Sequence, residues 1–397
     1  VGDAYIRFYQ QSTHAVIGAP YEVTSPWSTG ELSDLRWQYI PDEQAVYWTH
    51  PLHAMRKLAF TSAASWALTP APLNPFGKVV VIGSKGDVWT TDDFRKWETK
   101  PFIGIATPAS VPTILTPSYS DSRTRMFVVA NKADDGIYLS DDGESWVDVG
   151  PSTIDAPLAV SISKSGVIVI CGTGGGSVLN QIAVSTDGGL SFQQVTVPGA
   201  SALVWGLIAY DRSVDAWRVG SQTAGYGGYS YDGYTWASCP GPVAVGTDVG
   251  QEIQTNGSDL WVSVQTHRIR YSSSLTAAWT TAFSVTNHVF CAVAYGTPNG
   301  SPLWVAVKRQ SALLTDSSTL YVSSTAQSWT TVAQTFQDAV GTVKWLAPKF
   351  YAFGVGQKFY ESVDGTAWTT ITETAFYATT DGIITGILDD TPENADT

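Results

Sequence analysis

The chain has 397 residues, of which 14% are charged and 12% aromatic, and its formal net charge is −13. So many aromatic and so few charged residues argue against extensive disorder, and the negative charge argues against a nucleic-acid-binding surface. No apolar run approaches the roughly 20 residues of a membrane-spanning helix, and the three cysteines lack metal-ligand or disulfide-framework spacing.

Residues 1–70 are predicted to form a small β-rich module. Strands are expected in DAYIRFY (3–9), in HAVIGAPYEVTSPW (14–27) before a proline-marked turn, and in EQAVYWTHP (43–51), which Pro51 ends; MRKLAF (55–60) follows. A short helix is expected over STGELSDLRW (28–37), because Ser28 and Glu31 have the spacing of a capping box. The chain begins at Val1 close to a strand, so we expect that residues before Val1 have been removed.

A repeated motif, Ser/Thr-x-Asp-(x)-Gly-x-x-Trp/Phe, fills most of the remaining chain. Copies end at Trp146, Phe192, Trp236 and Trp368; a copy without glycine ends at Trp97, and degenerate copies end at Trp279 and Trp329. The copies are 39 to 50 residues apart. Each unit reads as four short strands, and about 45 residues per unit is the spacing of propeller blades. We predict an all-β fold with a seven-bladed β-propeller over residues 71–390. An eighth blade would follow if TSAASW, which ends at Trp66, is a further copy.

The motif resembles the Asp-box of sialidase-type β-propellers, a turn between the third and fourth strands of a blade. In such a turn the aspartate accepts backbone hydrogen bonds, glycine supplies a positive φ and the aromatic residue packs between sheets. We therefore expect a structural role for the motif aspartates, Asp93, Asp142, Asp187, Asp232 and Asp364.

Closing the ring requires a strand from the end of the chain. The first unit begins near Lys78 with a segment that reads as a second strand, and the apolar segment 383–388 is suited to be its missing first strand. We expect the two to pair, which would cover an open sheet edge. Residues 391–397 are expected to form an acidic tail. One hypothesis is that the acidic groups after Lys358 border a DNA conduit and keep DNA from binding.

Residues 21–60 resemble a module of bacteriophage tail proteins. In that module a PYE…(S/T)PY segment leads to an L..L...Q helix, a strand that ends in His-Pro, and a (K/R)L.R stretch. The corresponding residues here are Pro20, Tyr21, Glu22, Pro26, Trp27, Leu32, Leu35, Gln38, His50, Pro51, Lys57 and Leu58. Trp27 replaces the usual tyrosine, Gln38 comes one residue early, and Phe60 stands where arginine is frequent.

The resemblance is to the tail tube or nozzle (tail tubular protein B-like) family of short-tailed bacteriophages. It implies a structural virion protein, assembled in the bacterial host cytoplasm, that forms rings, usually hexamers, as part of the DNA-ejection conduit. The implied partners are copies of the chain itself, other tail proteins such as adaptors, fibres or spikes, and DNA that passes without specific binding. We expect no catalysis, cofactor or metal.

Two alternatives stay open. The first is a receptor- or glycan-binding propeller of a phage tail, in which the aromatic, glycine-rich segment 223–236 would contact sugars. The second is a sialidase-like glycoside hydrolase, which needs arginines for a substrate carboxylate and a pair of catalytic groups. The Arg-Ile-Pro signature is absent; the nearest arginines are Arg218 and Arg268, and the candidate carboxylates are Glu98, Glu144, Glu252, Glu361 and Glu373.

Overall fold

The protein is an all-β molecule of two compact units, Val1–Phe76 and Gly77–Thr397. The computed structural model describes residues 5–7, 22–25, 27–40, 45–50, 53–62, 65–70, 79–83, 87–91, 94, 96–100, 127–131, 136–140, 142–151, 154, 156–163, 165–172, 182–199, 203–222, 224–243, 248–286, 288–309, 317–336, 338–376 and 384–388. The helices found in these residues are two short 3-10 helices, η1 (Thr29–Asp34) and η3 (Pro298–Gly300). None of the described helices has the length and apolarity that a membrane crossing requires. The expected tail, 391–397, lies outside the described residues.

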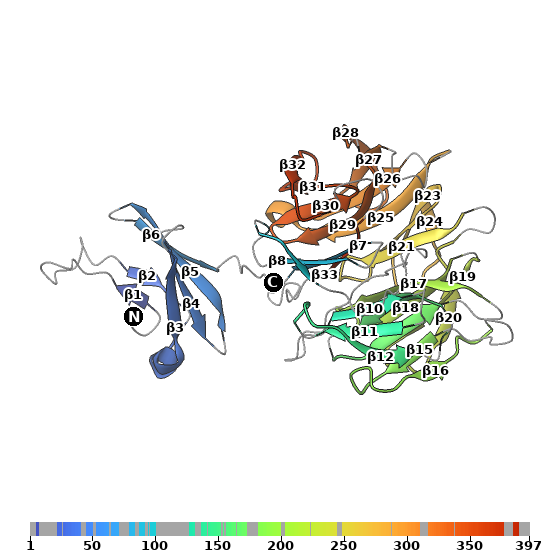
Figure 1. Ribbon diagram of the computed structural model, residues 1–397, viewed down its shortest axis with the longest axis horizontal. Helices are drawn as coiled ribbons and strands as arrows, with labels where there is room; N and C mark the ends of the chain where they lie inside the picture. The colour runs from blue at the N-terminus through green and yellow to red at the C-terminus, as the bar shows by residue number, and fades with distance from the viewer. Residues whose placement is uncertain are drawn as a thin grey trace, which may run out of the picture. The chain divides into compact units, whose positions relative to one another are not determined.

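The first unit contains two antiparallel sheets (Figure 1). One pairs β1 (Tyr5–Arg7) with β2 (Glu22–Thr24); the other is a meander of β3 (Arg36–Ile40), β4 (Ala45–His50), β5 (His53–Ser62) and β6 (Ser65–Pro70). Their core includes the buried side chains of Ile6, Trp27 and Leu58. Trp66 lies in β6, so the TSAASW segment belongs to this unit and not to the propeller.

The predicted capping box is present, but the helix is shorter than expected. The N–H of Ser28 donates to the Glu31 carboxylate at 2.8 Å at the start of η1. The helix ends at Asp34 rather than at residue 37, because Arg36 and Trp37 pair with Thr49 and Trp48 in the meander. Strand pairing and the aromatic content of this segment therefore override the helical pattern.

The second unit contains seven antiparallel sheets in its described residues. In sheet order they are β33 (Ile384–Leu388), β7 (Val79–Gly83), β8 (Val88–Thr91) and β9 (Glu98–Lys100); β10 (Phe127–Asn131), β11 (Gly136–Ser140) and β12 (Val147–Pro151); β13 (Pro157–Ile162), β14 (Ile168–Gly172), β15 (Ile182–Ser185) and β16 (Gln193–Val195); β17 (Trp205–Asp211), β18 (Ala216–Ser221), β19 (Tyr226–Ser230) and β20 (Ala237–Pro240); β21 (Gly250–Thr255), β22 (Trp261–Gln265), β23 (Arg268–Ser272) and β24 (Thr280–Ser284); β25 (Val289–Gly296), β26 (Leu303–Arg309), β27 (Ser318–Ser323) and β28 (Thr330–Phe336); and β29 (Val340–Leu346), β30 (Lys349–Gly354), β31 (Lys358–Ser362) and β32 (Thr369–Thr372).

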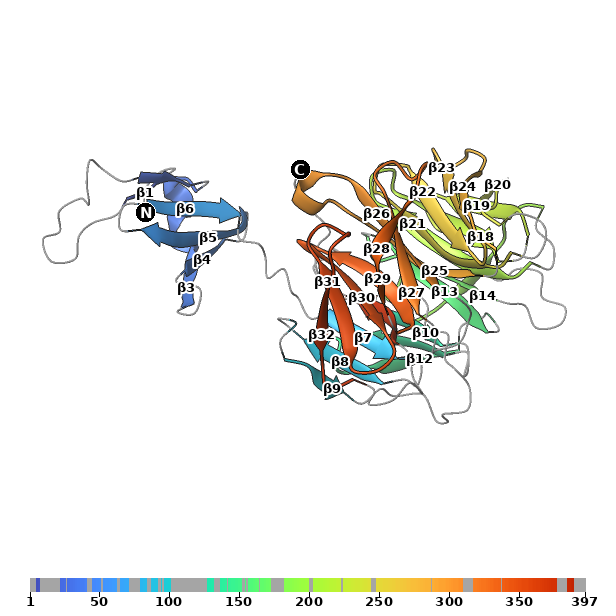
Figure 2. The ribbon, with the colours of Figure 1, turned by 90° about the horizontal axis from the view of Figure 1, so that it is seen from above.

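These sheets have the arrangement of a β-propeller (Figures 1 and 2). The first strands of successive sheets lie beside one another, from β13 through β17, β21, β25 and β29 to β33. A cluster that joins Val80 and Ile82 to Tyr138 and Trp146 connects the β33–β9 sheet to the β10–β12 sheet. Six sheets have the expected four strands, whereas the β10–β12 sheet has three described strands. The described residues thus show six complete blades, not the seven expected.

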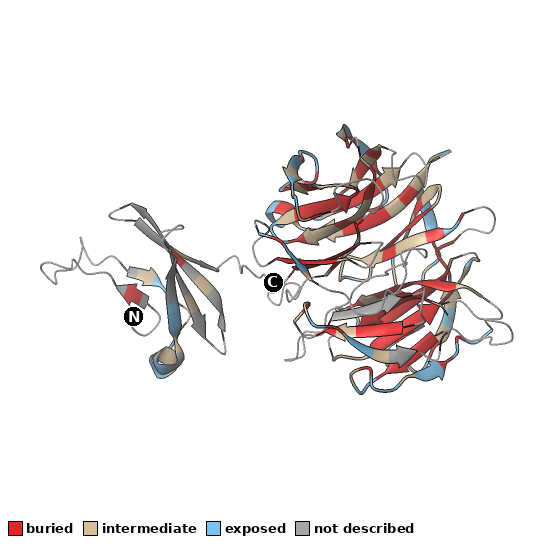
Figure 3. Cartoon of the chain, viewed as in Figure 1, coloured by how far each residue is buried: buried red, intermediate tan, exposed pale blue. Residues whose placement is uncertain are grey.

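Burial decreases from the inner strands to the outer strands of the blades (Figure 3). The second strands β7, β14, β18 and β22 are buried at every position, as expected for a strand covered by sheets on both faces. The outermost strand β9, in contrast, has two exposed residues and one intermediate. The hydrophobic core of this unit therefore lies between the faces of neighbouring blades.

The expected closing strand is confirmed. Strand β33 pairs antiparallel with β7, with Ile384 opposite Gly83 and Leu388 opposite Val80. The side chains of Ile384 and Ile387 are buried. The end of the chain thus supplies the first strand of the first blade, and the edge of β7 is not left open.

Alternating strand directions give the propeller two different ends. In each four-stranded meander, the turn between the first and second strands lies at the same end as the turn between the third and fourth. The turn between the second and third strands lies at the opposite end, together with the connection to the next blade. We call these the box end and the connection end.

Candidate functional site

The repeated motif forms a turn before the last strand of a blade, which we call a box turn. In the turn at 230–236, the Asp232 carboxylate accepts the N–H groups of Tyr234 and Thr235 at 2.8 and 2.6 Å. The Ser230 hydroxyl accepts the N–H of Gly233 at 2.8 Å, and Gly233 has a φ of 77°. Trp236 is buried between neighbouring sheets. These are the expected structural interactions.

The other described motif aspartates have the same role. Asp142 and Asp364 each accept two backbone N–H groups at 2.7 to 2.8 Å. Asp187 accepts the N–H of Ser191 at 3.0 Å, and hydrogen bonds from Ser191 and Ser185 lower the pKa of Asp187 to about 2. Asp93 lies outside the described residues. All four carboxylates therefore accept hydrogen bonds within their own turns.

The degenerate box turns keep the geometry with other side chains. The Ser274 hydroxyl replaces the carboxylate by accepting the N–H of Ala277 at 3.1 Å, and the Thr325 hydroxyl accepts the N–H of Gln327 at 3.3 Å. Phe94 and Ala326 occupy glycine positions with φ values of 58° and 65°. The turn therefore tolerates loss of its aspartate or of its glycine.

Arg218 supports one of these degenerate turns. Its guanidinium is fully buried and donates to the carbonyl oxygens of Ser274 at 2.9 Å, Ala277 at 3.0 Å and Pro240 at 3.2 Å. It also lies 4.4 Å from the centre of the Trp279 ring. Burial lowers the pKa of Arg218 to about 10, so the side chain is still charged at neutral pH. The arginine stabilises the turn that lacks an aspartate.

Most of the carboxylates considered for a hydrolase are bound to nearby groups. Glu98 and Glu144 both pair with Lys100, at 2.9 and 2.8 Å, and Glu361 pairs with Lys349 at 2.8 Å. Hydrogen bonds from Lys100 and Lys96 lower the pKa of Glu98 to about 2. The Glu373 carboxylate accepts the N–H of Ala375 at 2.9 Å.

Glu252 differs from the other four candidate carboxylates, because it lies on β21, the first strand of its blade. One carboxylate oxygen accepts the N–H of Val293 on β25, and the other accepts the Gln254 side-chain amide, both at 2.9 Å. Burial raises the pKa of Glu252 to about 7, against hydrogen bonds from Gln254 and Val293 that lower it. Glu252 thus joins two neighbouring blades and titrates near neutral pH.

The residues of the phage-tail resemblance are only partly described. Pro20, Tyr21, Pro26 and Pro51 lie outside the described residues. Glu22 lies in β2, and His50 ends β4 opposite His53. Gln38 lies in β3, opposite Tyr47, so its expected place in a helix is wrong.

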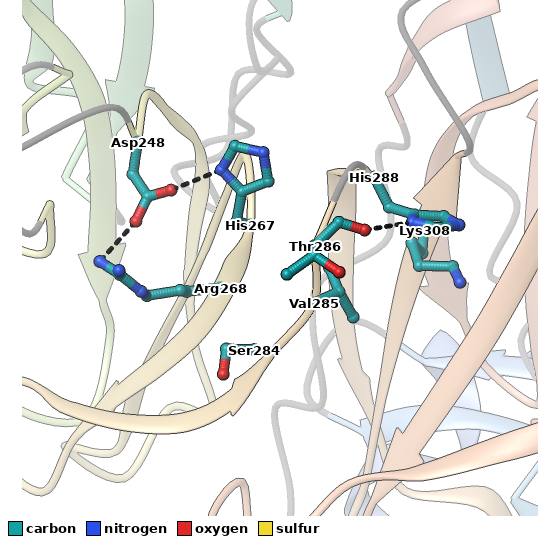
Figure 4. A pocket seen from close by; sticks show the side chains of 8 residues that line it. All are labelled: Asp248, His267, Arg268, Ser284, Val285, Thr286, His288 and Lys308. Carbon is teal, nitrogen blue, oxygen red and sulfur yellow. Dashed lines mark hydrogen bonds and ion pairs between the residues drawn. The ribbon is translucent and has the colours of Figure 1, made fainter.

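A pocket lies at the connection end, between the blades of β21–β24 and β25–β28 (Figure 4). Its volume is about 680 Å³. Asp248, His267 and Arg268 line one side, and Val285, Thr286, His288 and Lys308 line the other, with Ser284 below (Figure 4). Asp248 lies just ahead of β21, and His267 and Arg268 lie where β22 turns into β23. The end of β24 and the connection to β25 supply Ser284 and the three residues opposite, and Lys308 lies near the end of β26. Of the lining residues, only Arg268 was singled out by sequence; nothing in the spacing of the others predicts that they meet.

The buried carboxylate of Asp248 organises one side of this pocket. It forms an ion pair with the Arg268 guanidinium at 2.6 Å and contacts His267 Nδ1 at 2.9 Å. A carboxylate accepts, so His267 carries its proton on Nδ1 and its Nε2 is left for other partners. On the other side, His288 Nδ1 donates to the Thr286 carbonyl at 2.7 Å. Nε2 of His288, like that of His267, is therefore left for other partners.

Comparison with known proteins supports the fold alone. No family model and no curated protein matches the sequence. Among solved structures, the dihydro-heme d1 dehydrogenase NirN in complex with DHE is 11% identical with a TM-score of 0.52, and the match covers 80% of this chain and 65% of that one, just under two thirds. A chain of the nidogen/laminin complex is 10% identical (TM-score 0.45; 78% and 97% covered), and the GH74 enzyme of Niastella koreensis is 15% identical (TM-score 0.40; 87% and 66% covered). At such low identity the similarity to NirN indicates a shared propeller fold and nothing about activity.

Proposed function

We propose that this chain is a structural subunit of a bacteriophage tail, in the ring of a nozzle or tail tube that forms part of the DNA-ejection conduit. The observation that carries the proposal is the order of segments in the first unit. A strand at Glu22, the capped helix η1 and a strand that ends at His50 occur in the order of the phage-tail module, with the additional strand β3 between η1 and the last of them, ahead of a propeller. In this role the protein is a virion component, assembled in the bacterial cytoplasm, and performs no catalysis.

The first unit offers a surface suited to self-association. Trp37 is 65% exposed and lies on β3, at the edge of the four-stranded sheet. Exposed aromatic side chains and open sheet edges both favour contacts between chains. We propose that Trp37 lies in the contact between ring subunits, while the propeller presents its loops to other tail proteins.

We also propose that the β10–β12 sheet is a seventh blade. Strand β10 corresponds in the repeat to β14 and β18, which are second strands of their sheets. The place of a first strand, ahead of β10, lies outside the described residues. Buried clusters that join this sheet to the sheets on both sides support the proposal.

Mass photometry of the full chain tests the ring. We expect a defined oligomer whose mass is a multiple of 42.6 kDa, and we expect Trp37→Ser to shift it to single chains. Leu190→Ser is the matched control, because Leu190 is 81% exposed but lies in a box turn of the propeller. A wild-type protein that is monomeric at all concentrations contradicts the proposal, as does equal dissociation by both variants.

A further inference from the structure

We propose that the pocket between the blades of β21–β24 and β25–β28 binds a polar organic ligand that carries a single carboxylate. The inference is independent of ring assembly, because every residue it uses belongs to one propeller unit. It adds a binding site to a chain whose proposed role is otherwise structural.

The charges of the pocket favour a monoanion. Among the residues that line the pocket, Arg268 and Lys308 are cationic and Asp248 is anionic, which leaves one net positive charge when both histidines are neutral. The nearby Arg270 donates instead to the carbonyls of Pro242 and Trp279. The chain as a whole has a net charge of −13. A local excess of positive charge in the pocket would therefore attract an anion to this part of the surface. A phosphate ester with close to two negative charges would not be neutralised.

Asp248 holds the arginine in position without consuming all of its donors. The carboxylate is 3% exposed, whereas the Arg268 side chain is 39% exposed and has no other ion-pair or hydrogen-bond partner among the described residues. A guanidinium has five N–H donors in a planar fork, and a carboxylate matches that fork with two parallel hydrogen bonds. The rest of the Arg268 fork is therefore available to a ligand.

Lys308 provides the second cation from the opposite side. Its ammonium lies 5.6 Å from the centre of the Tyr321 ring and has no carboxylate partner in the described part of the chain. Ser284 and Thr286 have hydroxyl groups in the lining, and Nε2 of His267 and of His288 is left without a partner in the same described residues. These groups suit the hydroxyls of a polyol or sugar.

The pocket is open to solvent and large enough for an organic ligand. Its volume is about 680 Å³, and small-molecule sites usually have about 300–1,000 Å³. A carboxylated sugar would place its acid group on Arg268 and its hydroxyls on the opposite side.

Isothermal titration calorimetry with three probes tests the ligand class. We expect saturable binding of glucuronate, weaker binding of glucose 6-phosphate and no comparable binding of neutral glucose. Absence of glucuronate binding overturns the proposal. Tighter binding of glucose 6-phosphate overturns the carboxylate assignment in favour of phosphate, and equal binding of glucose overturns the role of charge.

Two variants locate the site. Arg268→Gln and Lys308→Gln should each weaken glucuronate binding by roughly 10-fold or more, the usual effect of losing a hydrogen bond to a charged group. Lys358→Gln is the matched control, because it removes the same charge from an ion pair with Asp338 in another blade. Arg268→Gln leaves Asp248 without its ion-pair partner and could unfold the protein for that reason. Lys308→Gln breaks no ion pair among the described residues, so it tests the site even in that case. Unchanged affinity in Lys308→Gln, or an equal loss in Lys358→Gln, contradicts the proposal.

Discussion

At the scale of single residues, the box turns depend on backbone conformations that only some residues adopt without cost. Gly365 has a φ of 72°, and a methyl group added there would meet Leu303 Cδ2 at 2.5 Å. Ala326 has nearly the same φ and is nevertheless buried in its turn. The neighbouring blade, and not the conformation alone, thus decides what a box turn accepts.

We therefore expect Gly365→Ala to destabilise the propeller by about 2–4 kcal/mol, from the cost of a positive φ together with overpacking. Gly257→Ala is the control, because Gly257 has a φ of 69° and nothing within 4 Å of the added methyl group. It should cost only about 1 kcal/mol. Urea denaturation followed by tryptophan fluorescence measures both changes, and equal losses would show that the contact with Leu303 is unimportant.

Arg218 gives a second prediction at this scale. Arg218→Met keeps much of the side-chain volume but removes the three hydrogen bonds that the guanidinium donates to the carbonyls of Ser274, Ala277 and Pro240. These carbonyls still accept from Ser272 Oγ and Trp279 Nε1. We expect a loss of roughly 2–3 kcal/mol, since a hydrogen bond to a charged group contributes about 1.5–3 kcal/mol. Arg218→Lys should recover part of the loss, because a lysine retains the charge beside Trp279. Equal stability of the methionine variant and the wild type in urea denaturation would contradict this role.

At the scale of the strands, β33 pairs with β7 and so joins the C-terminal part of the propeller to its first blade. Truncation after Thr380 removes β33 and leaves the edge of β7 unpaired, so we expect a lower unfolding midpoint and association through the open edge. Truncation after Asp390 is the control and retains every residue of β33. Differential scanning calorimetry and size-exclusion chromatography measure the two effects. Identical behaviour of both truncations would mean that β33 does not hold the ring closed.

The stability of the propeller is expected to depend on pH through Glu252, which joins the inner strands β21 and β25. The folded-state pKa of Glu252, about 7, lies above its ordinary value of 4.5. The protonated Glu252 side chain therefore stabilises the folded state fully below about pH 4.5, and this contribution is lost as the pH rises through about 7. Between pH 5 and 8 the wild type should lose on the order of 1–3 kcal/mol of stability from this group. Glu252→Gln, which resembles the protonated acid, should flatten that slope.

Glu98→Gln is the control for this pH dependence. Its lysine partners hold the pKa of Glu98 at about 2, so the group does not titrate between pH 5 and 8. Urea unfolding at a series of pH values should therefore give the wild-type slope for Glu98→Gln. A wild-type slope in Glu252→Gln would show that another group governs stability in this range.

What the sequence could predict follows from how local each interaction is. A box turn closes within eight residues, so its pattern is visible in one short segment, as at Ser230–Trp236 or in the hydroxyl-based turn before Trp279. The pocket brings together four separate segments, and no spacing reveals that Asp248 contacts Arg268 or that Lys308 lies opposite. The early end of η1 is another non-local effect, because strand pairing with β4 determines it.

At the scale of the whole molecule, the propeller should fold without the first unit. Each unit has its own core, around Ile6, Trp27 and Leu58 in the first and between the blades in the second. The closing strand of the propeller comes from its own C-terminal end, so no strand of its described sheets is supplied by residues 1–76. Independent cores and separate sheets are the conditions under which a unit folds alone.

The separate fragment Gly77–Thr397 tests this independence. We expect one cooperative thermal transition at the same temperature as the propeller transition of the full chain. Glucuronate should bind the fragment as it binds the full chain, because the pocket lies wholly in this unit. If Trp37 forms the ring contact, the fragment should also be monomeric in mass photometry. A fragment that lacks a cooperative transition would show that the first unit stabilises the ring of blades, whereas a folded fragment that still forms the full oligomer would place the subunit contact in the propeller.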